Sequence, residues 1–424
     1  MLAEREQPLP QGWSAIRLGE YTEESKARAG TNHQLPVLSV TKHRGIVRSE
    51  DFFKKAVYSR DTSNYKVVRP GQFAYATIHL NEGSIGKLKV RTPGVVSPMY
   101  TVFDVNTDVD SDYLLAVLKS QQSLTVYERI TQGTVSRRGG IAFRTLSDLV
   151  LHHPPLGEQR KISAILSSVD EAIEKTQAVI NQVLVVKRGL AQELLTRGIP
   201  GRHTHFQQTE IGEIPADWDF RLLGALATPD RGLQTGPFGS QLHKADYSPR
   251  GVPVLMPKDM MDGRVSDSNS ARVPEAKAEE LSRHRVKAGD LLFARRGEIG
   301  RVGLVTACEK GWLCGTGCLR FRPKDPTVSP YLRYWTSWSK SVRWLNEHAV
   351  GQTMLNLNTS ILGRLPVALP SESERSDIVE LLEALEKRVT TLEASVVGFR
   401  RVKSALMSVL LTGELRVTPD SEPE

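Results

Sequence analysis

The chain has 424 residues, of which 39% are hydrophobic and 25% charged, and its formal net charge is +8. This composition excludes a disordered chain, and the length allows two or three domains with cores of their own. No apolar run approaches the ~18 residues of a membrane span, and the first residues, MLAEREQPLPQGW, lack the apolar stretch of a signal peptide. We therefore expect a cytoplasmic protein with no membrane partner.

The charge is unevenly distributed along the chain. Segments 1–153 and 201–369 are net basic, segment 154–200 is near neutral, and segment 370–424 is acidic. Basic globular segments favour a polyanionic partner, whereas an acidic helical segment favours a protein neighbour. Charge alone therefore favours nucleic-acid binding over a surface that is merely basic.

Cysteine chemistry is not expected to contribute to function. Cys308, Cys314 and Cys318 lie close together in sequence, but they form no CxxC pair and have no histidines at ligand spacing. We expect reduced thiols in or near strands and no metal site.

The whole chain is a tandem duplication with a period near 216 residues. LPVLSV from Leu35 corresponds to VPVLMP from Val252, and GSIGKL from Gly83 corresponds to GEIGRV from Gly297. The offset drifts inside the globular segments and is constant in the helical ones. Two copies of one plan are expected to do similar jobs on two related targets.

Each globular segment is predicted to mix strands and helices. Short apolar runs alternate with Gly, Asn and Asp turn signals, and longer helical runs follow from Asp112 and from Pro330. We predict an α+β fold with a pseudo-twofold repeat. The expected parts are a first mixed α/β domain, a first long helix, a second mixed α/β domain, a second long helix and an acidic tail, at residues 1–153, 154–200, 201–369, 370–413 and 414–424.

The two long helical segments carry an apolar position every 3.5 residues, which is coiled-coil periodicity. The first seam consists of Ile162, Leu166, Val169, Ile173, Thr176, Ile180, Val183, Lys187, Leu190 and Leu194. The second seam keeps the same phase and consists of Ile378, Leu382, Leu385, Val389, Leu392, Val396, Phe399, Lys403, Leu406 and Leu410. At about 1.5 Å per residue, each seam is about 48 Å long.

An exposed apolar stripe of this length would aggregate, so we expect the two helices to pair with each other. The alternative is two ordinary amphipathic helices that belong to the cores of separate domains. Each helix has a glutamate near its start, Glu158 and Glu374, where a negative charge suits the helix dipole.

The sequence contains no recognisable catalytic constellation. GSIGK from Gly83 and GEIGR from Gly297 lack the spacing and the Lys–Ser/Thr of a phosphate-binding loop. There is no Asn/Asp-Pro-Pro-aromatic motif of base amino-methylation, no HExxH and no serine nucleophile elbow. The Glu-x-Lys of Glu275 and Lys277 stands alone in a polar segment. We therefore predict a non-catalytic recognition protein without a metal or cofactor of its own.

The second half contains LQTGPFGSQLHKADYSPRGVPVL from Leu233, RGEIGRVGLV from Arg296 and GQTMLNLN from Gly351. In their order along the chain, these stretches resemble the DNA specificity subunit of type I restriction-modification enzymes, and the resemblance covers residues 8–415. The first half lacks GPFGS and looks like a different recognition subtype, with FAYATIHLNEGSIG from Phe73. The second helix also departs from the pattern, because it has Arg375 at the position equivalent to Gln159 of the first helix.

The resemblance implies two target recognition domains, each of which reads one half of a bipartite, asymmetric DNA sequence. The two helices would form an antiparallel intramolecular coiled coil that spaces the half-sites and docks two methyltransferase subunits. Methylation with S-adenosylmethionine would occur in those partners after base flipping. ATP-dependent translocase subunits, with ATP and Mg, would add restriction.

Candidate DNA-binding residues are basic or amide side chains in glycine-flanked loops. Arg can bind guanine with two hydrogen bonds and Asn or Gln can bind adenine, whereas Lys more often meets phosphate. The candidates are Lys42, His43, Arg44, His79, Asn81, Arg137 and Arg138 in the first domain, and Gln241, Lys244, Lys258, Arg295, Arg296, Gln352 and Asn356 in the second. The leading candidates are the two pairs of adjacent arginines, Arg137 with Arg138 and Arg295 with Arg296.

Two other classes of function stay open at the level of sequence. One is a self-contained DNA-modifying or DNA-cutting enzyme, which would turn over DNA without a partner. The other is a coiled-coil scaffold without base readout, whose complexes would not bind DNA.

Overall fold

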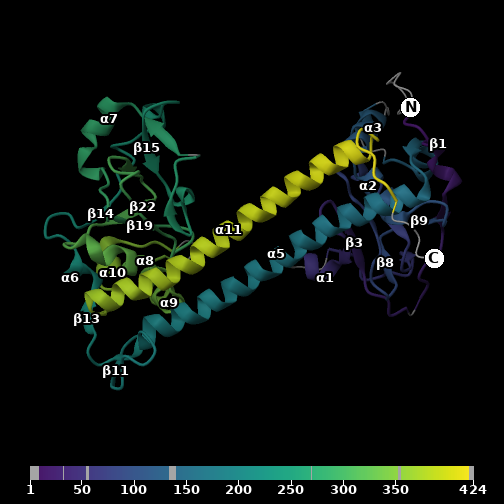
Figure 1. Cartoon of the computed structure of the whole chain (residues 1–424). Helices are drawn as coiled ribbons and strands as arrows, with labels where there is room; N and C mark the ends of the chain where they lie inside the picture. Colours follow the sequence, from purple (N-terminus) through teal and green to yellow (C-terminus); the bar gives the residue numbers. More distant parts are fainter. Residues whose placement is uncertain are drawn as a thin grey trace. The chain divides into compact units, whose positions relative to one another are not determined.

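The chain forms two units, and each unit contains parts of both long helices (Figure 1). The computed structural model describes residues 9–31, 33–53, 57–132, 140–268, 270–351 and 355–419. Unit 1 comprises Met1–Ala178 with Glu393–Glu424, and unit 2 comprises Val179–Leu392. The helices α5 (Leu156–Arg197) and α11 (Glu372–Leu410) each contribute to both.

Unit 1 is built on an antiparallel sheet of order β2-β9-β6-β7. Its aromatic residues Phe73, Tyr75 and Phe103 share a core with Tyr113 and Tyr127 of the helices that follow the sheet. The strands are β1 (Ser14–Arg17), β2 (Thr22–Ser25), β3 (Leu38–Thr41), β4 (Gly45–Arg48), β5 (Lys66–Val68), β6 (Phe73–Ala76), β7 (Ile85–Lys87), β8 (Gly94–Val96), β9 (Tyr100–Val105) and β10 (Val150–His153). The helices are η1 (Leu18–Glu20), α1 (Ser49–Phe52), η2 (Leu80–Glu82), α2 (Ser111–Leu118), α3 (Gln121–Gln132) and α4 (Phe143–Ser147).

Unit 2 is built on a sheet of order β14-β22-β19-β20-β17-β16. Phe293 and Phe321 of the sheet pack in one core with Tyr331 and Trp335 of α8. The strands are β11 (Phe206–Thr209), β12 (Gly212–Pro215), β13 (Asp219–Leu222), β14 (Leu233–Thr235), β15 (Val252–Leu255), β16 (Met260–Met261), β17 (Gly263–Val265), β18 (Ala271–Val273), β19 (Leu291–Ala294), β20 (Val302–Leu304), β21 (Leu313–Cys314), β22 (Cys318–Phe321) and β23 (Pro366–Leu369). The helices are α6 (Leu223–Leu226), η3 (Lys244–Asp246), η4 (Pro257–Asp259), α7 (Glu275–Glu280), η5 (Ser282–His284), η6 (Pro326–Val328), α8 (Ser329–Ser337), α9 (Ser339–His348) and α10 (Thr359–Gly363).

The duplication seen in the sequence is present in the strand pairing. The β2-β9-β6-β7 order of unit 1 matches β14-β22-β19-β20 of unit 2. The registers match as well: Ala76 faces Tyr100 at the end of β6, and Ala294 faces Cys318 at the end of β19. The predicted α+β tandem repeat is therefore confirmed.

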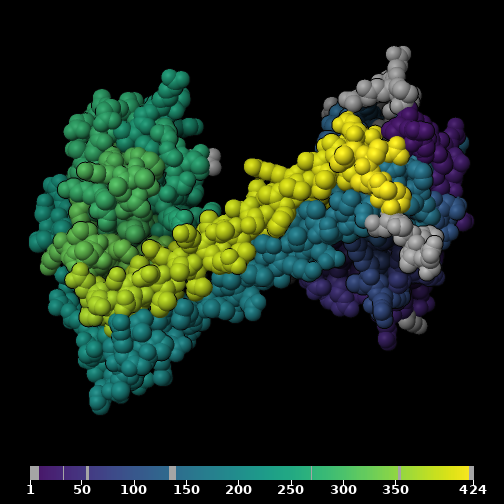
Figure 2. Space-filling model, viewed as in Figure 1, coloured from purple at the N-terminus to yellow at the C-terminus, as the bar shows by residue number. Residues whose placement is uncertain are grey.

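The two long helices pair antiparallel, as predicted (Figures 1 and 2). In unit 1 the Lys403 ammonium lies 2.6 Å from an Asp170 carboxylate oxygen, and in unit 2 the Lys187 ammonium lies 2.6 Å from Glu386. The same number of residues separates the two ion pairs on each helix, so one register holds in both units. Every residue of the two predicted seams is buried or half-buried.

Each core receives residues from both helices, so the alternative of two helices belonging to separate domain cores is wrong. Ile162 of α5 and Leu410 of α11 lie in the core of unit 1. Leu194 of α5 and Ile378 of α11 lie in the core of unit 2. Of the helices in the described ranges, none is both long and apolar enough to cross a bilayer.

Candidate nucleic-acid interface

Loops from distant parts of unit 2 meet at one end of its sheet, and we call them the second loop cluster (residues 236–242, 255–258, 295–297, 315–317 and 355–357). The turn Gly315–Cys318 is the hub of this cluster. The Gly236 amide donates to the Cys318 carbonyl (3.0 Å), the Arg295 amide to the Gly317 carbonyl (2.9 Å), and the Gly315 amide to the Leu255 carbonyl (2.8 Å). Backbone hydrogen bonds of this kind hold the loops in fixed relative positions.

The cluster depends on glycine at its closest approach. A Cβ on Gly236 would lie 1.8 Å from the Gly315 carbonyl oxygen, whereas a Cβ on Gly239 would meet nothing within 4 Å. Both glycines belong to the GPFGS stretch. Only the first is required by the packing.

We expect Gly236→Ala to displace the 236–242 loop and to lower the stability of unit 2 by ~1–3 kcal/mol, because two backbones must move apart. Urea denaturation of the purified chain measures this. Gly239→Ala is the matched control, with an expected change within about 0.5 kcal/mol. Equal stability of the two variants would contradict the close packing of this turn.

Arg295 and Asn356 are brought together although they lie far apart in sequence. Arg295 Nε donates to Asn356 Oδ1 (3.1 Å), and the Leu357 amide donates to the Arg295 carbonyl (2.9 Å). Arg295 is half-buried, whereas its neighbour Arg296 is exposed and forms a backbone bridge to Asn356. Gln352 lies outside the described residues.

The other candidates of unit 2 have mixed roles. The Gln241 side-chain oxygen accepts a hydrogen bond from the Phe238 amide (3.1 Å), so this glutamine shapes its own loop. Lys258 is exposed in η4 within the cluster, and Lys244 is exposed in η3. Phe238, which the sequence analysis did not single out, is 56% exposed in the 236–242 loop and is a further candidate for DNA contact. An aromatic residue between a proline and a glycine is the sequence feature that indicates it.

Unit 1 has an equivalent set of loops, which we call the first loop cluster (residues 77–82, 97–99 and 140–141). The Ile141 amide donates to the Thr77 carbonyl (2.9 Å), and Thr77 Oγ1 donates to the Met99 carbonyl (3.1 Å). His79 and Asn81 belong to this cluster, and His79 pairs with Glu82 at 2.9 Å.

Lys42, His43 and Arg44 form the exposed turn between β3 and β4. Lys119 donates to the Lys42 carbonyl (2.9 Å) and thereby ties this turn to α2–α3. Arg137 and Arg138 lie outside the described residues. For the remaining candidates, base contact is still a prediction, and the structure adds their positions.

A comparison with known protein families gives this arrangement its context. The model of the type I restriction modification DNA specificity domain matches residues 50–184 and, a second time, residues 244–396. The chain belongs to this family. It is a specificity subunit of a type I restriction-modification system, with two target recognition domains.

Individual relatives agree with this assignment. The MjaVIII specificity subunit of Methanocaldococcus jannaschii is 23% identical over 427 residues, which cover 96% of this chain and 94% of the relative. The EcoBI specificity subunit of Escherichia coli is 25% identical over 310 residues, which cover 70% of this chain and 62% of the relative.

Solved structures share the fold. A chain from a type I restriction-modification complex matches with a TM-score of 0.58 at 16% identity, over 96% of this chain and 100% of that one. The specificity subunit from M. genitalium matches with a TM-score of 0.54 at 12% identity, over 96% and 98% of the two chains.

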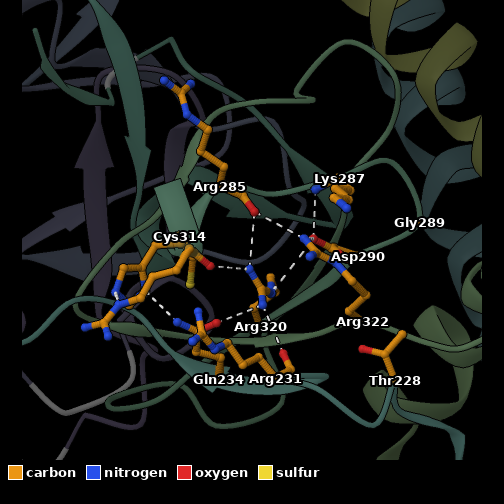
Figure 3. A network of polar contacts seen from close by, with 12 residues as sticks. Thr228, Arg231, Gln234, Arg285, Lys287, Gly289, Asp290, Cys314, Arg320 and Arg322 are labelled. Carbon is orange, nitrogen blue, oxygen red and sulfur yellow. Dashed lines mark hydrogen bonds and ion pairs between the residues drawn. The ribbon is translucent and has the colours of Figure 1, made fainter. Parts of the chain in front are cut away.

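A buried charge network lies in the sheet that carries the second loop cluster of this specificity subunit (Figure 3). Asp290 is 1% exposed and binds the Arg322 guanidinium through two hydrogen bonds of 2.7 and 2.6 Å. Arg320 is 2% exposed and donates to the carbonyls of Arg283 and Arg231 (2.9 and 3.0 Å). Arg320 thereby connects β22 to η5 and to the segment before β14.

His284 lies beside this network and adds no charge to it at neutral pH. Burial, together with the positive charges of Arg283 and Arg320, lowers the pKa of His284 to about 4. Arg320 Nε lies 4.0 Å from the Asp290 carboxylate, so Arg320 and Arg322 share this one buried acidic group.

The first turn of each long helix holds the segment that follows the other helix. In unit 1 a buried glutamate, Glu158, binds Arg416 through two hydrogen bonds of 2.8 Å. In unit 2 the equivalent glutamate, Glu374, accepts from the Ile199 amide (3.0 Å) and the Trp218 indole (3.1 Å) and lies 2.8 Å from His203 Nε2. These contacts fix where each coiled-coil helix begins relative to the end of its partner.

Glu386 makes a pH-dependent contribution to the stability of the helix pairing in unit 2. Burial alone would raise its pKa, but hydrogen bonds from Lys187 (2.6 Å) and Arg333 (3.0 Å) hold the pKa below its ordinary 4.5. A carboxyl group whose pKa is lower in the folded protein stabilises the folded state at pH values above its unfolded-state pKa. This stabilisation is lost as the pH falls through the folded-state pKa.

We therefore expect Glu386→Gln to be less stable than the wild type by ~2 kcal/mol at about pH 7, and the difference to shrink as the pH falls below about 4.5. Urea titrations at a series of pH values measure this. The equivalent Asp170→Asn is the control and should show a smaller difference, because the Asp170 side chain is 45% exposed and that of Glu386 12%. A difference that is independent of pH would contradict the assignment.

Proposed function

We propose that each target recognition domain reads one half of a bipartite, asymmetric DNA sequence through its loop cluster, and that α5 and α11 act as a spacer. The observation that carries the proposal is the duplicated sheet, which presents two loop clusters built from different side chains. The net basic charge of both globular segments supports contact with the phosphate backbone.

We also propose that the outer faces of the paired helices dock two methyltransferase subunits. Val185 and Val186 of α5 are 59% and 51% exposed, and Val397 and Val402 of α11 are 47% and 50% exposed. Apolar side chains on the outside of a helix pair are typical of protein interfaces. S-adenosylmethionine would be bound by these partners, and ATP and Mg by a translocase subunit, so this chain would supply recognition and no catalysis.

Methylome sequencing of cells with and without the gene tests the function. We expect one bipartite methylated sequence that disappears with the gene. Replacement of residues 214–369 by the same segment of another specificity subunit should change one half of that sequence and leave the other half intact. An unchanged sequence would refute the assignment of domains to half-sites.

The rival functions have their own outcomes in the same system. Methylation or cleavage by the purified chain without partners would support a self-contained enzyme. A complex with methyltransferase subunits that fails to bind DNA even at low salt would support a scaffold without base readout.

A further inference from the structure

The two loop clusters differ in chemistry at one structurally equivalent position. Arg295 follows Ala294, which faces Cys318 across the sheet, and Thr77 follows Ala76, which faces Tyr100. The carbonyl of Arg295 accepts from the Leu357 amide, and that of Thr77 accepts from the Ile141 amide, both at 2.9 Å. The same backbone junction therefore carries an arginine in unit 2 and a threonine in unit 1.

The residue that faces this junction also differs between the domains. Asn356 precedes Leu357 in unit 2, and Gly140 precedes Ile141 in unit 1. A Cβ on Gly140 would lie 2.7 Å from the Thr77 side chain, so this junction has no room for an asparagine. An amide that can hold an arginine is thus present in one domain and sterically excluded from the other.

The hydrogen bond from Arg295 Nε to Asn356 Oδ1 determines which nitrogens of the Arg295 guanidinium can meet a base. With Nε engaged, the guanidinium retains its two terminal nitrogens, whose parallel N–H groups match the O6 and N7 acceptors of guanine. The Asn356 side-chain oxygen accepts this hydrogen bond with one of its two lone pairs, so the amide is held against the guanidinium. Asn356 is therefore a positioning residue for Arg295.

The first junction presents apolar atoms in place of the arginine. Ile78 and Met99 are 45% and 59% exposed beside Thr77, whose hydroxyl donates to the Met99 carbonyl. In the major groove an apolar side chain discriminates by contact with the C5-methyl group of thymine. The chemistry of this junction matches thymine.

We propose that this junction is a base-reading position in both domains, at which Arg295, held by Asn356, selects a guanine in one half-site, and Ile78 with Met99 selects a thymine in the other. The proposal rests on the proposed function and specifies which residues separate the two half-sites. It predicts a guanine in the half-site of unit 2 and a thymine in that of unit 1.

The first test uses the complex with its methyltransferase partner and oligonucleotides that carry single modified bases. Replacement of the critical guanine by 7-deazaguanine removes the N7 acceptor and should weaken binding by the wild type about tenfold, but should not weaken binding by Arg295→Ala further. Replacement of the critical thymine by deoxyuridine removes the methyl group and should weaken binding by the wild type about three- to fourfold, but not binding by Ile78→Ala with Met99→Ala.

Sequence preference separates base reading from phosphate contact. Arg295→Ala and Arg295→Lys should lose about 5- to 150-fold of discrimination at one guanine and leave the other half-site unchanged. Arg264→Ala, which removes an exposed arginine from β17, is the matched control and should leave discrimination at that guanine unchanged. Uniform weakening over all sequences by Arg295→Ala would overturn the proposal.

Variants of Asn356 test the positioning role. Asn356→Ala should reduce the preference for guanine, whereas Asn356→Asp retains an acceptor for Nε and should restore that preference while weakening binding to all sequences. Equal preference for guanine in both variants and the wild type would overturn the role of Asn356. A wild-type complex that methylates a bipartite sequence without a guanine in the half-site of unit 2 would overturn the inference and leave the proposed function intact.

Discussion

Asp290→Ala is expected to destabilise unit 2 by ~3–5 kcal/mol, because removal of one partner from a buried ion pair leaves the other charge uncompensated. Asp290 is the carboxylate that Arg322 binds through two hydrogen bonds, and it also accepts from the Lys287 amide (2.8 Å). Urea denaturation followed by tryptophan fluorescence measures the effect, because five of the six tryptophans lie in unit 2.

The duplication provides a matched control at the equivalent position of unit 1. There Gln72 accepts from the Arg69 amide (2.7 Å) and donates to Asp104, which is exposed. Gln72→Ala should cost only ~1 kcal/mol, because water can reach the partner that it leaves. If Asp290→Ala cost no more than Gln72→Ala, the buried charges would not contribute as the geometry indicates.

Glu374→Ala is expected to destabilise unit 2 by ~3–5 kcal/mol. The substitution leaves the Trp218 indole, the Ile199 amide and His203 without their common acceptor in the interior. Glu374→Gln keeps one acceptor and the shape of the side chain, so a smaller loss is expected. Denaturant midpoints with unchanged slopes would measure both losses.

Glu372→Ala is the control for the helix dipole. Glu372 is exposed in the first turn of the same helix, so its loss should cost less than about 1 kcal/mol. A comparable loss for Glu372→Ala and Glu374→Ala would mean that charge at the helix start, and not the hydrogen bonds to the segment after α5, is what stabilises unit 2.

The periodic features of the fold could be predicted from sequence. The seams follow a 3.5-residue repeat and the duplication follows a fixed offset, and both patterns depend on residue spacing alone. The acidic partners of Lys187 and Lys403 could not be identified in this way, because Glu386 and Asp170 lie beside the seams and the pairing register is a tertiary property. The position of Glu374 in the sequence indicates a helix-dipole residue, but its hydrogen-bond partners lie 156 to 175 residues away in sequence.

The candidate site was predictable by residue type and not by arrangement. Arg320 lies in an apolar strand, and no local pattern distinguishes a buried arginine there from one that faces solvent. The contact between Arg295 and Asn356 joins residues 61 positions apart, so periodicity could not reveal it. Which of these side chains meet bases is still a prediction.

Glu158, at the start of α5, affects how the ends of the chain could be connected. Its partner Arg416 also donates to the Gln11 carbonyl (2.9 Å), and Gly413 packs against Pro10 and Trp13. Residues 413–416 and 10–13 of unit 1 therefore lie in contact, whereas in unit 2 the continuous segment from Gly198 to Trp218, which includes β11 and β12, takes the corresponding place. A circular permutant joined near residues 419 and 9, and opened at 201–205 before β11, should retain both cores and bind the same DNA sequence.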